Sequence, residues 1–377
     1  MKLPRRLVPV AVSALAAATA LVVPQAGPSA GPTEPAAVQA SKHDDFVIVG
    51  HRGASGYRPE HTLASYELAA RMGADFIEPD LVTTKDRVLV ARHEPEIGGT
   101  TDVAAHPEFA GRKKTKQLDG VAVTGWFTED FTLAELKTLR AVERIPQNRP
   151  HNTLYNGRYQ IASYQEVLDL TKRLGRELHR TLGTYPEVKH STFFKSIGNP
   201  TEPKLVAILK RNGLDRPDAP AIIQSFEVSN LIALHQQVRT PLLQLTSASG
   251  APADFVANGD KRTYADLVTP QGLREVAKYA KYLGPDKAQV IPRDKNDNLG
   301  TPTALVADAH TAGLKVQPYT FRNENPFLPA NLRSSAEPDA YGDVFTEEAA
   351  FFKAGVDGFF ADQPDTALES LHAFLGR

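Results

Sequence analysis

The sequence predicts an α/β protein folded as a (β/α)8 barrel with an insertion after its second strand. From residue 46 to the C-terminus, short apolar runs rich in β-branched residues alternate with longer amphipathic segments. Such alternation is typical of parallel strands joined by helical crossovers. There are eight units of each kind, and a (β/α)8 barrel needs roughly 250 residues plus any insertions.

The expected elements follow one another along the chain. The strands are predicted at "FVIVG" (46–50), "DFIEPDLV" (75–82), "RTLGTYPEV" (180–188), "AIIQSF" (221–226), "PLLQLT" (241–246), "AQVIP" (288–292), "LKVQPYTF" (314–321) and "VDGFFA" (356–361). The helices are predicted at 62–72, 163–174, 202–212, 228–237, 271–280, 302–312, 346–354 and 365–376. A doubly wound open sheet is the alternative, but "GHRGASG" after the first strand does not match the glycine-rich turn G-x-G-x-x-G of that fold.

Two segments are longer than a barrel requires, and both follow predicted strands at the face where barrels build binding sites. The segment 322–345 is short and rich in Asn, Pro and Ser, whereas the insertion at about 94–160 is long and rich in polar and turn-forming residues. We expect the insertion to be a lid or pocket wall with one helix at "TLAELKTL". Its single tryptophan, Trp126, either packs this lid or contacts the substrate.

The N-terminal residues predict export. Lys2, Arg5 and Arg6 precede an apolar run and then small residues, the order of a signal peptide, which we place at 1–30. A membrane anchor is the alternative, but the run is short and contains Pro9. Residues 31–43 are predicted to be a Pro/Ala-rich linker and 44–377 the folded domain of a secreted protein with no membrane anchor. The formal net charge of −1 argues against a nucleic-acid partner.

Three acidic residues are expected to converge at the barrel mouth. Glu78 and Asp80 lie two residues apart on the second strand and therefore share a face, and Glu187 lies near the end of the third strand. Three adjacent carboxylates raise one another's pKa unless a cation lies among them. Oxygen ligands, in a chain with no cysteine, favour Ca²⁺ or Mg²⁺ over zinc.

Two histidines and two cationic residues complete the pattern. His51 and His93 also fall at strand ends, where one can act as general base and the other as general acid. Arg52 and Lys189 can neutralise a phosphoryl group. A glycosidase would use the carboxylates but leave these four residues without a role. The combination therefore favours cleavage of a phosphodiester.

The segment 46–95, containing "HRGASGYRPEHTLASYELAARMGADFIEPDLVTTKDRVLVARHEP", resembles the glycerophosphodiester phosphodiesterases, most closely their secreted bacterial branch. Further matches occur at "YPEVKH", "IIQSFE", "QPYTFRNEN" and "AGVDGFFADQPD". The sequence departs from the family pattern at "PEHT", where "PENT" is commoner, and at "HEPEI", where the family often has "HD".

The resemblance implies a barrel that hydrolyses small glycerophosphodiesters to glycerol 3-phosphate and an alcohol with a divalent cation, commonly Ca²⁺. By matching motif it implies an acid/base role for His51 and His93, with His93 our choice for the acid, and phosphate contacts for Arg52 and Lys189. It assigns the metal to Glu78, Asp80 and Glu187, and places Glu60 behind the groups that touch substrate. A related phospholipase D-like lyase acting on lysophospholipids and a catalytically inactive binding barrel are the alternatives. The head group and the oligomeric state are left open.

Overall fold

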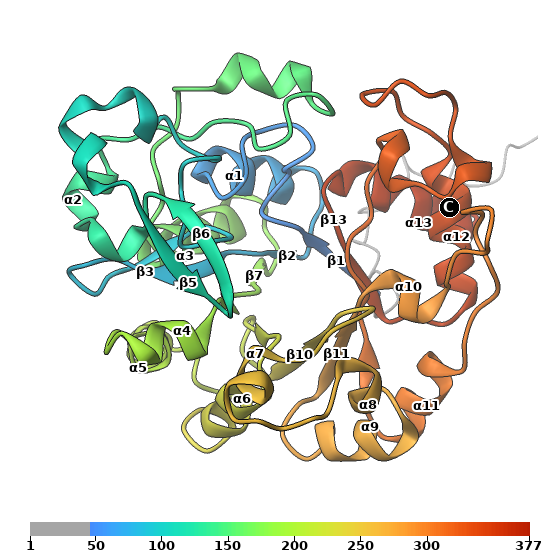
Figure 1. The fold of residues 1–377 in the computed structure, drawn as a ribbon. Helices are drawn as coiled ribbons and strands as arrows, with labels where there is room; N and C mark the ends of the chain where they lie inside the picture. Colours follow the sequence, from blue (N-terminus) through green and yellow to red (C-terminus); the bar gives the residue numbers. More distant parts are fainter. Residues whose placement is uncertain (1–45) are drawn as a thin grey trace, which may run out of the picture. The chain divides into compact units, whose positions relative to one another are not determined.

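The computed structural model describes residues 46–377, so the predicted signal peptide and linker lie outside the described residues. Ten short parallel strands form the barrel wall: β1 (Val47–Gly50), β2 (Phe76–Ile77), β3 (Asp80–Thr83), β7 (Gly183–Thr184), β8 (Glu187–Val188), β9 (Ile223–Ser225), β10 (Leu242–Thr246), β11 (Tyr282–Pro285), β12 (Lys315–Val316) and β13 (Gly358–Ala361). β2 and β3 are two halves of one barrel strand, as are β7 and β8. Eight parallel barrel strands result, which confirms the predicted fold class (Figure 1).

The breaks within the second and third barrel strands occur at prolines. Pro79 separates β2 from β3 and Pro186 separates β7 from β8. Proline lacks the N–H that a central strand would donate, so regular pairing stops there. The neighbouring backbone still bridges the gap, because Glu187 N donates to Pro79 O at 3.0 Å. The barrel closes between its last two strands, where Phe321 N donates to Phe360 O at 2.8 Å.

One amphipathic helix follows each barrel strand, as predicted: α1 (Leu63–Arg71), α3 (Tyr164–Glu177), α5 (Glu202–Arg211), α6 (Val228–His235), α9 (Pro270–Val276), α11 (Leu305–Thr311), α12 (Val344–Lys353) and α13 (Pro364–Leu375). Local sequence signals start several of them. Ser163 and Glu166 form a capping box at α3, and the Thr62 side chain accepts from Ser65 N at α1. The apolar faces of the helices pack against the outside of the barrel strands, and the two form a hydrophobic core. Within the described residues no helix is long and apolar enough to cross a membrane.

The prediction of the sixth strand was wrong. Residues 288–292 begin in a short helix, α10 (Lys287–Val290), and the sixth barrel strand is β11. The Asp286 side chain accepts from Ala288 N at 2.8 Å and caps α10. In β11, a Cβ on Gly284 would lie 2.6 Å from a methyl group of Leu243. The leucine side chains pack into the space that glycine leaves, and β11, with the sequence Tyr-Leu-Gly-Pro, lacks the β-branched signal that Val290 and Ile291 carry.

The insertion contains more regular structure than the sequence predicted. Its elements are η1 (Val103–Ala105), η2 (Pro107–Arg112), β5 (Lys114–Leu118), β6 (Val121–Gly125), η3 (Thr128–Asp130), α2 (Leu133–Leu136) and η4 (Pro150–Tyr155). Only α2 was expected. β5 and β6 form a hairpin around Asp119 and Gly120, which both have positive φ, 49° and 84°. Trp126 is buried in the apolar cluster of the insertion and donates from Nε1 to Phe109 O at 2.8 Å, which favours packing over substrate contact.

The remaining elements are neither barrel strands, nor the helices that follow them, nor parts of the insertion. The second barrel strand extends into an antiparallel pair with β4 (Leu89–Ala91), whose last residue is two positions before His93. The other short helical segments are α4 (Ser191–Ser196), α7 (Ala253–Ala257), α8 (Tyr264–Leu267), η5 (Asn325–Phe327) and η6 (Ala330–Leu332). The described residues, 46–377, all belong to one compact unit, so the insertion packs as part of the barrel domain.

Candidate active site

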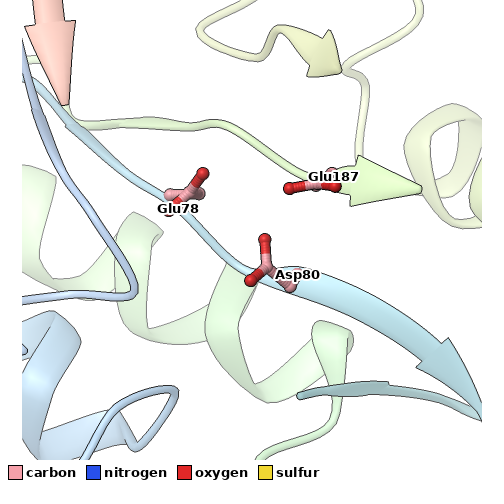
Figure 2. Close-up of side chains that lie close together, drawn as sticks. All are labelled: Glu78, Asp80 and Glu187. Carbon is pink, nitrogen blue, oxygen red and sulfur yellow. The ribbon is translucent and has the colours of Figure 1, made fainter. Parts of the chain in front are cut away.

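The three predicted metal ligands meet at the barrel mouth (Figure 2). Glu78 lies at the break between β2 and β3, Asp80 opens β3 and Glu187 opens β8. Asp80 and Glu187 are paired residues of neighbouring parallel strands, which brings their side chains to the same face. One carboxylate oxygen from each of the three residues lies within 4.8 Å of the others, and all three residues are buried.

Hydrogen bonds orient the carboxylates of this triad, Glu78, Asp80 and Glu187, but do not balance their negative charge. His61 Nε2 donates to Asp80 Oδ2 at 2.9 Å, and Gln224 Nε2 donates to Glu78 Oε1 at 2.6 Å. Lys189 Nζ lies 2.9 Å from Glu187 Oε1. Within residues 46–377, the buried Oδ1 atom of Asp80 has no hydrogen-bond partner.

The pKa values of the three carboxyl groups reflect this unbalanced negative charge. Burial, reinforced by Asp80 and Glu187, raises the pKa of Glu78 well above its usual range. Burial raises the pKa of Glu187 to about 8, although Lys189 opposes the shift. Burial also disfavours ionisation of Asp80, but His61 and Lys189 hold the pKa of Asp80 well below its usual range. An unpartnered oxygen among three crowded carboxylates fits a hard divalent cation.

His51 follows β1 and is held by the C-terminal end of the eighth strand. Its Nδ1 donates to Asp362 Oδ1 at 2.5 Å, and its Nε2 lies 3.7 Å from Glu78 Oε2. Asp362 is itself fixed by Arg149 Nη2 at 2.5 Å and Arg322 Nε at 2.7 Å. Burial lowers the pKa of His51 to about 4, with Asp362 opposing the shift. The imidazole therefore presents an unprotonated Nε2 toward the triad.

His93 faces the same site from the other side. Its Nδ1 donates to Glu94, and its Nε2 accepts from Lys189 Nζ at 3.3 Å. Burial, together with Arg52 and Lys189, lowers the pKa of His93 to about 3. Arg144 Nη2 donates to Glu94 Oε2 at 2.7 Å, so a residue of the insertion supports this histidine through Glu94. Each histidine thus has one nitrogen bonded to a carboxylate and the other facing the site.

Arg52 and Glu60 form an ion-pair network beside the triad. Arg52 N donates to Glu78 Oε2 at 3.0 Å, and Arg52 Nη1 donates to Glu60 Oε2 at 3.0 Å. Arg144 donates to both oxygens of Glu60, at 2.6 and 2.8 Å. Glu60 therefore orients Arg52, and Glu60 itself also lines the cavity beside Arg52. His51, Arg52, His93 and Arg322 line two adjoining cavities, of about 230 and 210 Å³.

The structure brings together all eight residues that the sequence singled out, and it adds several more. Sequence reasoning missed Asp362, Glu94, His61 and the arginines 144, 149 and 322. Asp362 directly follows the eighth strand in "FFADQPD", a strand-end position that could have identified it. His61 is the departure in "PEHT", and its bond to Asp80 gives that departure a function. The arginines of the insertion carry no local signal.

Comparisons with known proteins identify the family of the chain. The family model described as "Glycerophosphoryl diester phosphodiesterase family" matches residues 51–366. An Arabidopsis thaliana glycerophosphodiester phosphodiesterase is 36% identical over 326 residues, covering 83% of this chain and 82% of that protein. A Haemophilus influenzae glycerophosphodiester phosphodiesterase is 29% identical, covering 87% of this chain and 90% of that protein.

Among solved structures, a glycerophosphoryl diester phosphodiesterase homologue from Silicibacter pomeroyi DSS-3 superposes with a TM-score of 0.61 at 20% identity. The match covers 88% of this chain and 94% of that chain, and it supports the barrel fold. The extent of the family match, together with the sequence identity to curated members, decides the assignment. The chain belongs to the glycerophosphoryl diester phosphodiesterase family.

Proposed function

We propose that this family member hydrolyses glycerophosphodiesters to glycerol 3-phosphate and an alcohol, with a divalent cation and two histidines at one site. The observation that carries the proposal is the arrangement of the two imidazoles around the triad. Both have Nδ1 bonded to a carboxylate, and both present Nε2 to the cavities that Arg52 also lines. Curated relatives that align along most of the chain carry the activity in their names.

The hydrogen bonds of the two histidines support an acid/base pair. A histidine that donates Nδ1–H to a carboxylate has a free lone pair on Nε2 and can accept the proton of the attacking hydroxyl. The carboxylate then stabilises the imidazolium that forms. The second histidine must carry a proton on Nε2 to deliver it to the leaving alkoxide. A bound phosphodiester, which is an anion, favours that protonated form. The two histidines share this geometry. We propose His51 as the base and His93 as the acid, and the leaving-group experiment below tests that order.

The cationic groups act on the phosphoryl oxygens. Arg52 is oriented by Glu60, and Lys189 lies between Glu187 and His93, so both ammonium and guanidinium groups are fixed before substrate arrives. Fixed donors stabilise charge that develops on the phosphoryl group without reorganisation cost. Glu78, Asp80 and Glu187 would hold a divalent cation, Ca²⁺ or Mg²⁺, which supplies Lewis-acid polarisation of a phosphoryl oxygen when bound.

Release of glycerol 3-phosphate from glycerophosphocholine tests the function. The wild-type protein should release it, and His51→Ala and His93→Ala should each lower kcat by about 10² to 10⁴, the range for loss of a general acid or base. The exposed His235→Ala, on α6, is a matched control that should leave kcat unchanged. A wild-type protein that binds glycerophosphodiesters without releasing product would instead support a binding barrel.

The leaving group separates the two histidines. A nitrophenolate leaves without protonation, so loss of the general acid should be partly rescued on a nitrophenyl phosphodiester and loss of the base should not. His93→Ala should therefore show the rescue and His51→Ala should not. The opposite pattern would exchange the roles, and equal rescue of both variants would refute a division of labour.

We also propose that the protein is exported after removal of residues 1–30. The basic, apolar and small-residue order of that segment supports this. N-terminal sequencing of protein collected from culture medium should find a start between Ala26 and Ala40. Recovery of the full-length chain from the membrane fraction alone would identify the segment as an anchor.

A further inference from the structure

A cavity of about 260 Å³ opens beside the triad, on the side away from the arginines. It adjoins the catalytic cavity, because Glu187 and Phe226 line both. The segments that follow the third, fourth and fifth barrel strands and the tip of the β5–β6 hairpin form its walls. A group attached to the phosphate on this side would therefore enter this cavity.

Aromatic rings and small side chains form the apolar part of this cavity. Phe226 and Tyr264 meet edge to face, with ring centroids 6.1 Å apart at 79°. Ala251 and Ala253 also line the cavity and leave room beside the rings. The ammonium of Lys189 lies 5.7 Å from the centroid of Phe226, which shows that this ring already borders a positive charge. Aromatic faces attract ammonium groups, quaternary ones included.

The charges in this cavity are not balanced. Its carboxylates are Asp119, Glu187 and Glu227; the hairpin residue Asp119 pairs with His190 at 2.5 Å and Glu187 pairs with Lys189. Glu227 is 3% exposed and accepts only from Thr192, from N at 3.0 Å and from Oγ1 at 2.5 Å. No basic side chain of residues 46–377 forms an ion pair with Glu227.

The pKa of Glu227 shows the same imbalance. Burial, reinforced by Asp254 and Asp119, raises it to about 7. A buried carboxylate whose ionised form is disfavoured in this way gains stability from a cation brought next to it. The cavity therefore has one carboxylate that lacks a counter-ion among the residues that the structure describes.

The cavity on the opposite side of His51 has the reverse balance. Four arginines (Arg52, Arg144, Arg149 and Arg322) and three carboxylates (Glu60, Glu143 and Asp362) line it. The four arginines are ion-paired with carboxylates, and an uncharged polyol can hydrogen-bond to such a wall. The two substituents of a phosphodiester would thus meet different environments.

On the basis of the proposed function, we propose that the Glu227 cavity binds the alcohol portion of the substrate and selects positively charged alcohols, choline or ethanolamine in type. Glu227 is the counter-ion, and Phe226 and Tyr264 enclose the ammonium. The glycerol portion then occupies the arginine-lined cavity. The enzyme therefore prefers some head groups over others, and both the charge and the size of the head group set this preference.

The test compares two substrates that differ only in charge: glycerophosphocholine and its 3,3-dimethylbutyl isostere, in which carbon replaces the quaternary nitrogen. The wild-type protein should favour glycerophosphocholine in kcat/KM by about tenfold, the order expected for a partly buried ammonium site. In Glu227→Gln this ratio should fall toward one, and Glu227→Asp, which keeps the charge, should retain more of it. Glu275→Gln, an exposed change of the same type on α9, should keep the wild-type ratio.

The outcomes separate the two proposals. Hydrolysis of neither diester would refute the proposed function, whereas equal hydrolysis of both by the wild-type protein would refute only the head-group site. A second measurement does not depend on variants that could misfold. Choline should inhibit hydrolysis of glycerophosphoglycerol by the wild-type protein at a concentration about tenfold lower than 3,3-dimethylbutanol does. Equal inhibition by the two alcohols would overturn the inference.

Discussion

Replacing Glu94 by glutamine tests how the insertion contributes to catalysis. The Glu94 carboxylate accepts Nδ1–H of His93 and also accepts from Arg144 at 2.7 and 3.1 Å. Burial opposes ionisation, but His93 and Arg144 hold the pKa of Glu94 well below its usual range. The carboxylate is therefore ionised at neutral pH and stabilises the imidazolium form of His93. Glutamine keeps the shape of the side chain and removes that charge.

The size of the effect follows from the kind of bond that is lost. A hydrogen bond to a charged group contributes about 1.5 to 3 kcal/mol, and about 1.4 kcal/mol corresponds to a tenfold change in rate. If His93 is charged during proton transfer, Glu94→Gln should lower kcat by roughly 10- to 150-fold. KM should change little, because Glu94 lines neither catalytic cavity. Loss of the anion also lowers the pKa of His93 further, so the limb of the pH profile that reports its protonated form should move to lower pH.

The assay is kcat and KM for glycerophosphocholine across pH, with thermal unfolding measured in parallel. Glu67→Gln is a matched control, because Glu67 is ion-paired on the surface of α1 with Arg71 at 2.7 Å and lies outside the site. It should leave both constants unchanged. A Glu94→Gln enzyme with kcat within about twofold of wild type and an unshifted profile would refute the positioning role.

Three further outcomes are expected. Extensive chelation should abolish turnover, and Ca²⁺ or Mg²⁺ should restore it. The cation should also raise the melting temperature, since a ligand bound only by the native state stabilises that state. Full activity of the chelated protein would contradict the metal site. Burial raises the pKa of Glu348 to about 8, so the native state retains a proton that the unfolded state has lost. That contribution to stability is complete below the usual carboxyl pKa of about 4.3 and is lost as the pH rises toward 8. Glu348→Gln should thus stabilise the protein by about 4 to 5 kcal/mol at pH 8 and have little effect at pH 4, as urea unfolding at the two pH values can show. Trp126→Ala should destabilise the protein by about 3 kcal/mol or more through a cavity in the insertion core, yet leave the relative rates on different head groups unchanged; altered head-group preference would place Trp126 at the substrate.

The sequence predicted most of the fold because both periodicities were strong. An apolar strand such as "FVIVG" followed by an amphipathic helix such as Leu63–Arg71 recurs around the barrel. Seven of the eight strand predictions overlap observed strands. The failure at the sixth strand came from its composition, since β11 contains Gly284 and Pro285 and no β-branched residue, so it carries little strand signal. The β5–β6 hairpin was also missed, although Asp119-Gly120 between alternating residues is a strong turn signal.

The site residues that lie at the ends of strands could be predicted, because a barrel brings the C-terminal ends of all its strands to one face. The contacts that orient those residues could not. Asp362 lies 311 residues from His51, and Arg144 lies 84 residues from Glu60, separations over which no local pattern operates. Which carboxylate supports which histidine depends on how the insertion folds back over the barrel mouth. That arrangement is a tertiary property.

The insertion supports the candidate site through its arginines, which balance the charge of buried carboxylates. Arg144 balances Glu60 and Glu94, while Arg149 balances Asp362 and the fully buried Glu324. An insertion without these arginines would leave several buried carboxylates without cations, at a cost of about 3 to 5 kcal/mol for each broken buried pair. Two of these carboxylates, Asp362 and Glu94, also bond His51 and His93, so Arg149 and Arg144 both stabilise the insertion against the barrel and help to position the two histidines. Changes in the insertion that preserve Arg144 and Arg149 can alter the walls of the substrate cavities while keeping the chemistry intact.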